Sequence, residues 1–117
     1  LLLCYTGRKS GRAYATPVNY VQEGDLLRIV SFKQRTWWRN LLDRSAVVVY
    51  LRGTARQVTA EVVQSEAAVA VQLGYLVRQA PALANYLQIP FDADGSPKSA
   101  ALEHAAVGRV VILLHLK

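Results

Sequence analysis

The sequence has 117 residues, of which 52% are hydrophobic and 19% charged, a composition that predicts one compact domain over residues 1–117. No apolar run approaches the about 18 residues of a membrane-spanning helix. The single cysteine, Cys4, excludes an internal disulfide and fits a reducing cytoplasm. Because the sequence contains no methionine, we expect an N-terminal segment upstream of it.

The formal net charge of +6 is concentrated in the first part of the chain. Residues 1–44 carry eight Lys or Arg against three Asp or Glu, whereas residues 45–117 carry six against five. This asymmetry indicates an anionic partner for the first part. Nucleic acid, an anionic membrane surface and a phosphorylated cofactor all fit that description.

Short apolar or alternating runs between Gly- and Pro-containing turns predict six strands. Pro17 places the second strand at a sheet edge, and Gly24 marks a hairpin between the second and third strands. Six strands in largely sequential order favour a mainly β fold with helices (α+β), a small closed barrel or roll, over a βαβ sheet. The expected strands are residues 1–5, 15–22, 26–32, 46–51, 56–63 and 109–116.

Capping residues and helical periodicity predict the helices between these strands. We expect a short helix over residues 35–44, capped by Thr36, with Trp37 and Leu41 on its buried face. Ser65 caps a second helix, which Pro81 ends or kinks. The remaining expected helical segments are a short turn over residues 81–87 and a helix from Ser96-Pro97 to Ala106, stopped by Gly108.

The turn after the first strand, Gly7-Arg8-Lys9-Ser10-Gly11, combines features of an anion site. Its glycines free the backbone for a close approach, and its cations and hydroxyl suit a phosphate or a carboxylate. The order of its residues differs from that of a Walker loop. A solvated basic hairpin turn is the alternative interpretation.

Other chemistry finds little support in the sequence. Cys4, His104 and His115 lack metal-ligand spacing, and we expect His115 to be a satisfied core residue of the last strand. The sequence has no nucleophile elbow and no paired carboxylates. What remains is aromatic residues beside cations, which can stack on a planar ring while the cations hold its anionic tail. Here we expect Trp37 to pack in the core and Trp38 to face solvent or a cleft as the stacking residue.

The basic turn at 7–11, followed by Thr16-Pro17-Val18, Val30-Ser31 and Trp37-Trp38-Arg39-Asn40-Leu41, resembles the deazaflavin-dependent nitroreductase family over about residues 1–63. The resemblance implies a split β-barrel related to the flavin-binding pyridoxamine-phosphate oxidases. It implies the deazaflavin coenzyme F420, with FMN as the alternative, and a small-molecule substrate: a nitro-type, quinone or conjugated acceptor. A homodimer is compatible with it.

The resemblance also implies which residues hold the coenzyme. The basic turn would bind its phosphate and oligoglutamate tail, Pro17 and Val18 would line the ring or chain, and Ser31 would make a polar contact. Tyr86 would donate a proton to the substrate, or is a half-buried helix tyrosine. Residues 91–106 would be an insertion that caps the pocket or fills a dimer interface. The coenzyme-binding candidates are Arg8, Lys9, Ser10, Gly11, Pro17, Val18, Ser31, Lys33, Trp37 and Trp38.

Three functions follow as hypotheses. The first is an oxidoreductase that delivers hydride from reduced deazaflavin, since such a site needs no general base from the protein. The second is a flavin-, deazaflavin- or haem-binding carrier without turnover. The third is a single-strand nucleic-acid binder, which we rank last because the cations cluster at a turn and a short helix instead of along strand faces.

Overall fold

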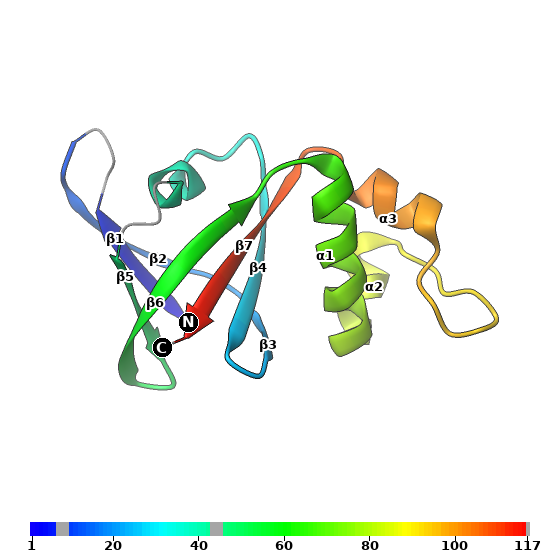
Figure 1. The fold of residues 1–117 in the computed structure, drawn as a ribbon, viewed down its shortest axis with the longest axis horizontal. Helices are drawn as coiled ribbons and strands as arrows, with labels where there is room; N and C mark the ends of the chain where they lie inside the picture. The colour runs from blue at the N-terminus through cyan, green and yellow to red at the C-terminus, as the bar shows by residue number, and fades with distance from the viewer. Residues whose placement is uncertain (7–9, 43–45, 117) are drawn as a thin grey trace.

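Seven strands form one antiparallel sheet in a computed structural model, which describes residues 1–6, 10–42 and 46–116 (Figure 1). The spatial order of the strands is β2-β1-β5-β6-β7-β4-β3. Their bounds are β1 Leu2–Thr6, β2 Ala13–Pro17, β3 Val21–Glu23, β4 Leu26–Phe32, β5 Ala46–Leu51, β6 Thr54–Val63 and β7 Arg109–Leu116. The helical elements are the 3-10 helix η1 Trp37–Leu41, α1 Glu66–Gln79, α2 Pro81–Leu87 and α3 Ser99–Ala106.

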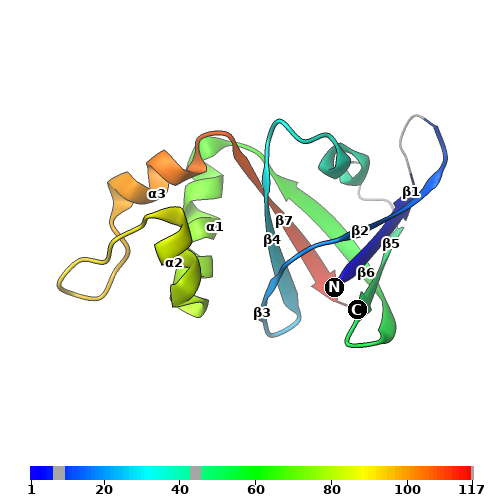
Figure 2. The ribbon, with the colours of Figure 1, turned by 180° about the vertical axis from the view of Figure 1, so that it is seen from behind.

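Strand β7 separates two hydrophobic cores. Alternate side chains point to opposite faces of a strand. Val110, Ile112 and Leu114 therefore lie in the core enclosed by the curved sheet, and Val111 and Leu113 lie in the core beneath the helices. The view from behind shows the three helices gathered on one side of the sheet, next to β4 and β7 (Figure 2). The continuous apolar run of the last strand is thus buried on both faces, as the sequence predicts.

The predicted boundary signals of the helices are largely confirmed. The Ser65 hydroxyl accepts a hydrogen bond from the Ala68 backbone N–H at 3.3 Å and caps α1. Pro81 occupies the first turn of α2, where its missing N–H costs nothing. Gly108 follows α3 with a φ of +73°, the left-handed conformation that ends a helix. The hairpin of β3 and β4 turns at Gly24, which has a φ of +58°.

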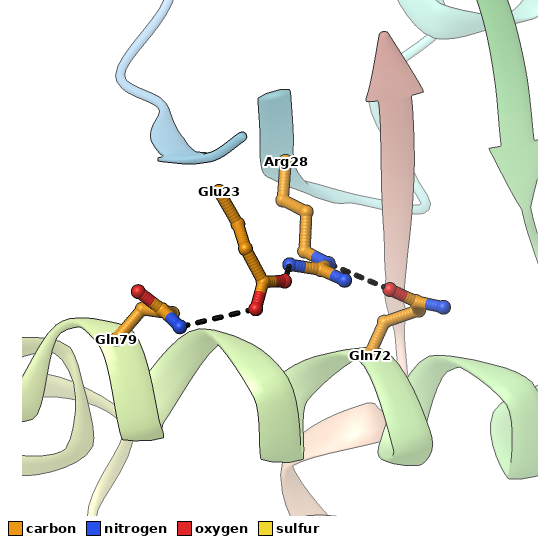
Figure 3. Close-up of polar contacts among 4 residues, drawn as sticks. All are labelled: Glu23, Arg28, Gln72 and Gln79. Atoms are coloured by element: carbon orange, nitrogen blue, oxygen red, sulfur yellow. Dashed lines mark hydrogen bonds and ion pairs between the residues drawn. The ribbon is translucent and has the colours of Figure 1, made fainter. Parts of the chain in front are cut away.

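A buried arginine joins the sheet to α1 (Figure 3). Arg28 is 6% exposed, and its Nη1 donates to Glu23 Oε1 at 2.6 Å while its Nε donates to Gln72 Oε1 at 2.9 Å. Gln79 Nε2 donates to the other Glu23 oxygen at 3.2 Å, and the Arg28 guanidinium lies 5.0 Å from the centre of the Tyr75 ring. These contacts fix the β3–β4 hairpin against two turns of α1. We call this group the Arg28 clasp.

The expected strand over residues 15–22 is wrong in its extent. The segment is two strands, because β2 pairs with β1 and β3 pairs with β4 at the other end of the sheet. Residues 18–20 carry the chain between these two ends, and the Val18 N–H donates to the Leu1 carbonyl at 3.0 Å. Strand β2 is an edge strand, as Pro17 predicts.

Two other expectations are also wrong. His115 lies on the outer surface next to Glu61, with 49% of its side chain exposed, because the helical core covers β7 only as far as Leu113. The last helix begins at Ser99 instead of Ser96-Pro97. The preceding residues form a tight loop in which Phe91 pairs with Pro97 and the Lys98 N–H donates to the Pro90 carbonyl at 2.9 Å.

Candidate functional site

A cavity of about 430 Å³ opens between the end of β4, the β2–β3 connection and α2. This volume is in the range of sites that enclose one small organic molecule, about 300–1,000 Å³. The lining residues are Asn19, Tyr20, Val30, Ser31, Phe32, Leu83, Tyr86, Leu87 and Arg109.

The strand pairing explains why the cavity lies here. Strand β3 pairs with β4 only from Leu26 to Arg28, so in the described residues β4 has no strand neighbour on that edge from Ile29 to Phe32. Helix α2 faces this open edge because Pro81 starts it directly after α1, which the Arg28 clasp holds against the sheet. A binding site at the open edge of a strand can use backbone groups as well as side chains.

The cavity combines apolar walls with a few polar groups. Val30, Leu83 and Leu87 supply the apolar surface. Ser31 is only 8% exposed. Its hydroxyl has no hydrogen-bond partner in the part of the chain that the structure describes. Tyr86 lines the cavity and is 73% exposed, so it is also open to solvent. Such a site suits a planar ring with a polar edge.

A stack of aromatic rings lies at the other end of the barrel, beside the β1–β2 hairpin. The ring centres of Tyr5 and Tyr14 are 5.8 Å apart with an angle of 22° between planes, and those of Tyr5 and Trp37 are 6.3 Å apart. The Arg12 guanidinium lies 5.9 Å from the centre of the Tyr14 ring, and the Tyr5 hydroxyl shares a 2.8 Å hydrogen bond with Thr16. We call Tyr5, Tyr14 and Trp37 the aromatic stack.

The structure describes only Ser10 and Gly11 of the basic turn at 7–11. Arg8 and Lys9 lie outside the described residues. The Ser10 hydroxyl accepts a hydrogen bond from the Arg12 N–H at 3.2 Å, and Gly11 has a φ of +70°. The seven residues between Gly11 and Asn19, which lines the cavity, allow a separation of at most about 29 Å when fully extended. The chain crosses the barrel from the β1–β2 hairpin to β3 (Figure 2), and Asn19 and Tyr20 in this crossing line the cavity.

Residues 1–6, 10–42 and 46–116 contain neither a cluster of metal-binding side chains nor a membrane-spanning helix. No group of three or more His, Cys, Asp or Glu side chains there is placed to hold a metal ion. None of the helices found there is long and apolar enough to cross a membrane.

The sequence model of one family, described as F420H(2)-dependent quinone reductase, matches residues 1–89, well over half of the chain. The chain belongs to this family. Its membership confirms the predicted deazaflavin-dependent oxidoreductase with F420 as its coenzyme. No curated protein matches the chain significantly.

Solved structures resemble this quinone-reductase family member over nearly its whole length. A proposed 5-nitroimidazole antibiotic resistance protein from Bacteroides thetaiotaomicron has a TM-score of 0.62 at 14% identity, with 99% of this chain and 71% of that chain covered. An F420 reductase has a TM-score of 0.53 at 18% identity, with 99% and 84% covered.

A proposed pyridoxamine 5′-phosphate oxidase from Listeria innocua has a TM-score of 0.57 at 12% identity, with 99% of this chain and 83% of that chain covered. At such identities the likeness concerns the fold. It confirms the predicted split β-barrel of the pyridoxamine-phosphate-oxidase type.

The predicted site residues of the quinone-reductase family member fall in different places. Ser31 and Tyr86 meet in the cavity. Val18 adjoins it in sequence but packs against the barrel core, and Pro17 is an exposed residue of the edge strand. The Lys33 ammonium donates to the Gln64 carbonyl at 3.3 Å and does not line the cavity.

The expected roles of the two tryptophans are reversed, because η1 is a 3-10 helix with three residues per turn. Trp38 and Leu41, three residues apart, share the buried face, and Trp38 is 2% exposed. A ring so deeply buried cannot stack on a coenzyme. Trp37 is half-buried against Tyr5 and is the tryptophan within reach of a ligand. Thr36 makes no side-chain cap.

Several residues of the two places escaped the sequence analysis. Tyr5 and Tyr14 are directly opposite each other across the β1–β2 hairpin, whereas counting residues outward from the predicted turn at 7–11 pairs Tyr5 with Ala13. Asn19, Phe32 and Arg109 carry no local signal. Arg109 reaches the cavity because β7 pairs with β4. In this pairing Arg109 lies opposite Phe32, which is 77 positions earlier in the sequence.

Proposed function

We propose that this protein transfers a hydride from reduced F420 to a quinone or similar conjugated small molecule, with the reacting rings meeting in the cavity between β4 and α2. The observation that carries the proposal is the cavity of about 430 Å³ at the open edge of β4, where Val30, Leu83 and Leu87 supply apolar surface and the Ser31 hydroxyl has no hydrogen-bond partner within the described residues. When bound, F420H2 gives up a hydride and a proton, which together reduce a quinone to a hydroquinone.

The cavity suits one ring system better than a complete coenzyme with its tail. The apolar side chains of Val30, Leu83 and Leu87 would contact ring faces, and the Ser31 hydroxyl would hydrogen-bond a polar ring edge. Apolar side chains around the reacting carbon exclude water, and this protects the hydride from loss to solvent protons. Binding and orientation are the contribution that hydride transfer needs from a protein.

The anionic part of F420 would extend toward the basic turn. Arg8, Lys9, Ser10 and Gly11 supply charge, a hydroxyl and a left-handed glycine at the hairpin end of the same chain segment. Pro17 and Val18 lie along that segment. Trp37 and Lys33 are further candidates for contacts with the coenzyme, through a ring face and a charge. The assignment of each of these residues is a proposal.

Tyr86 is the candidate proton donor for the acceptor. Tyr86 is 73% exposed, so its hydroxyl can recover a proton from solvent after each turnover. We further propose a cytoplasmic protein acting on a small-molecule substrate, including nitro-type compounds. A homodimer stays a prediction.

Titration of the purified protein with F420, followed by ring fluorescence, tests the proposal. We expect saturable binding at micromolar coenzyme, weakened about two- to tenfold by Ser31→Ala, which removes one hydrogen bond. Ser99→Ala is the matched control, because Ser99 is an exposed residue at the start of α3. Absence of micromolar binding would reject the coenzyme site. Binding without hydride transfer to any of a broad set of acceptors would favour the carrier instead.

A further inference from the structure

One wall of the cavity carries a cation whose position is fixed. Arg109 is opposite Phe32 in the β4–β7 register, and its guanidinium lies 5.2 Å from the centre of the Phe32 ring. Its Nη1 also donates to the Ala105 carbonyl at 2.8 Å. The ring contact and the hydrogen bond hold the planar guanidinium in one orientation at the cavity wall.

No opposite charge faces this guanidinium. The nine residues that line the cavity include no Asp or Glu, and Arg109 forms no ion pair in the part of the chain that the structure describes. A guanidinium has five N–H donors, and among the described residues only one of those on Arg109 has a protein acceptor. The remaining donors match an oxygen anion, which a guanidinium binds through two parallel hydrogen bonds.

We propose that Arg109 makes the cavity selective for acceptors that carry a carboxylate or another oxygen anion beside the reducible ring. This inference rests on the proposed function and adds the substrate class. Arg109 also lies outside residues 1–89, the stretch that the family model matches, so the selectivity belongs to the C-terminal part of this chain. Arg109 is a specificity residue in this proposal and takes no part in the hydride transfer.

The test compares two acceptors that differ only in charge, a 1,4-naphthoquinone with a short carboxyalkyl side chain and its methyl ester. The measured quantity is the ratio of kcat/KM for the acid to kcat/KM for the ester, with reduced F420 as donor. We expect the wild-type ratio to exceed tenfold, because a charge-assisted hydrogen bond changes affinity about ten- to a hundredfold. Arg109→Gln should bring the ratio close to one, and Arg109→Lys should retain part of the preference.

Arg78→Gln is the matched control, since Arg78 is an exposed arginine of α1 that does not line the cavity. It should leave the ratio unchanged. Melting temperatures of all variants separate misfolding from selectivity, and the charge-retaining lysine variant keeps the test usable if the glutamine variant is unstable.

Three outcomes would overturn the inference. Equal kcat/KM for acid and ester in the wild type, or a ratio unaffected by Arg109→Gln, would show that the charge is not used on the acceptor. A loss of F420 affinity in Arg109→Gln with an unchanged ratio would show that the anion is the coenzyme's own phosphate or carboxylate. In all three cases coenzyme oxidation continues, whereas a failure of the proposed function shows no oxidation with either acceptor.

Discussion

Replacing Glu23 by alanine should destabilise the protein measurably, because it leaves the buried cation of the Arg28 clasp without its counter-charge. Arg28 is 6% exposed and, among the described residues, would retain only Gln72 and the Tyr75 ring as partners. A hydrogen bond to a charged group contributes about 1.5–3 kcal/mol to stability. Because 47% of the Glu23 side chain is exposed and solvent screens the pair, we expect the lower end, about 1.5 kcal/mol.

The expected loss converts into a melting-temperature shift through the size of the protein. At about 2.1 cal/mol/K per residue, unfolding 117 residues has an entropy of about 0.25 kcal/mol/K, so 1.5 kcal/mol lowers the melting temperature by about 6 °C. Thermal unfolding followed by circular dichroism measures this shift. Glu103→Ala is the control, because Glu103 is an exposed carboxylate of α3, and we expect it to shift the melting temperature by less than about 2 °C.

Replacing the arginine of this ion pair should lower the stability less than replacing the glutamate does. Arg28→Met removes the buried cation and fills its space with an apolar side chain, and the half-exposed Glu23 carboxylate that remains can be solvated by water. A Glu23→Ala protein that melts within 2 °C of the wild type, or an Arg28→Met protein that is the less stable of the two, would refute the reasoning. Because the clasp holds α1, and α2 follows α1, Glu23→Ala should also weaken F420 binding.

Three further predictions concern the site. Lys9→Ala should weaken F420 binding about ten- to a hundredfold with little change in melting temperature, whereas Arg35→Ala should have a much smaller effect; equal and slight losses would mean that the charge acts only as a diffuse field. Trp38→Ala should cost about 3–5 kcal/mol of stability, while Trp37→Ala should mainly reduce coenzyme affinity, and unfolding curves with parallel F420 titrations would expose the opposite pattern. Tyr86→Phe should lower kcat with little change in F420 affinity, and an unaltered kcat would exclude the proton-donor role.

Local signals in the sequence predicted much of the fold. The side chain of Ser65 caps α1, Pro81 begins α2 and Gly108 ends α3, because capping depends on residues within a few positions of each other. The burial of β7 on both faces was also predictable from the sequence, since a continuous apolar run of that length indicates a strand that is covered on both sides.

Features that depend on tertiary contacts were not predictable in the same way. The Arg28–Gln72 hydrogen bond joins residues 44 positions apart, and nothing local to Arg28 indicates that its charge is buried. His115 was expected in the core because its strand is apolar, but the helices cover only part of that strand. The tryptophans were exchanged because Leu41 aligns best with Trp37 at 3.6 residues per turn but with Trp38 at three residues per turn.

The candidate site likewise contains some residues that the sequence predicted and others that depend on tertiary contacts. Ser31 and Tyr86 were predicted from a family resemblance and do meet in one cavity. Arg109 could not be found from the sequence, because its place in the cavity follows from the pairing of the last strand with β4. The Tyr5–Tyr14 pair of the aromatic stack was missed, because counting outward from the predicted turn at 7–11 places Tyr5 opposite Ala13, one residue from its observed partner.

The central claim is that the protein moves a hydride from reduced F420 to a quinone, and an anaerobic single-turnover experiment tests it most directly. Stoichiometric reduced F420 is mixed with the protein and a naphthoquinone, and coenzyme oxidation and hydroquinone are measured together. The account predicts one hydroquinone for each coenzyme oxidised, at a rate that Ser31→Ala reduces and Ser99→Ala does not. Coenzyme oxidation no faster than in a protein-free mixture would contradict it.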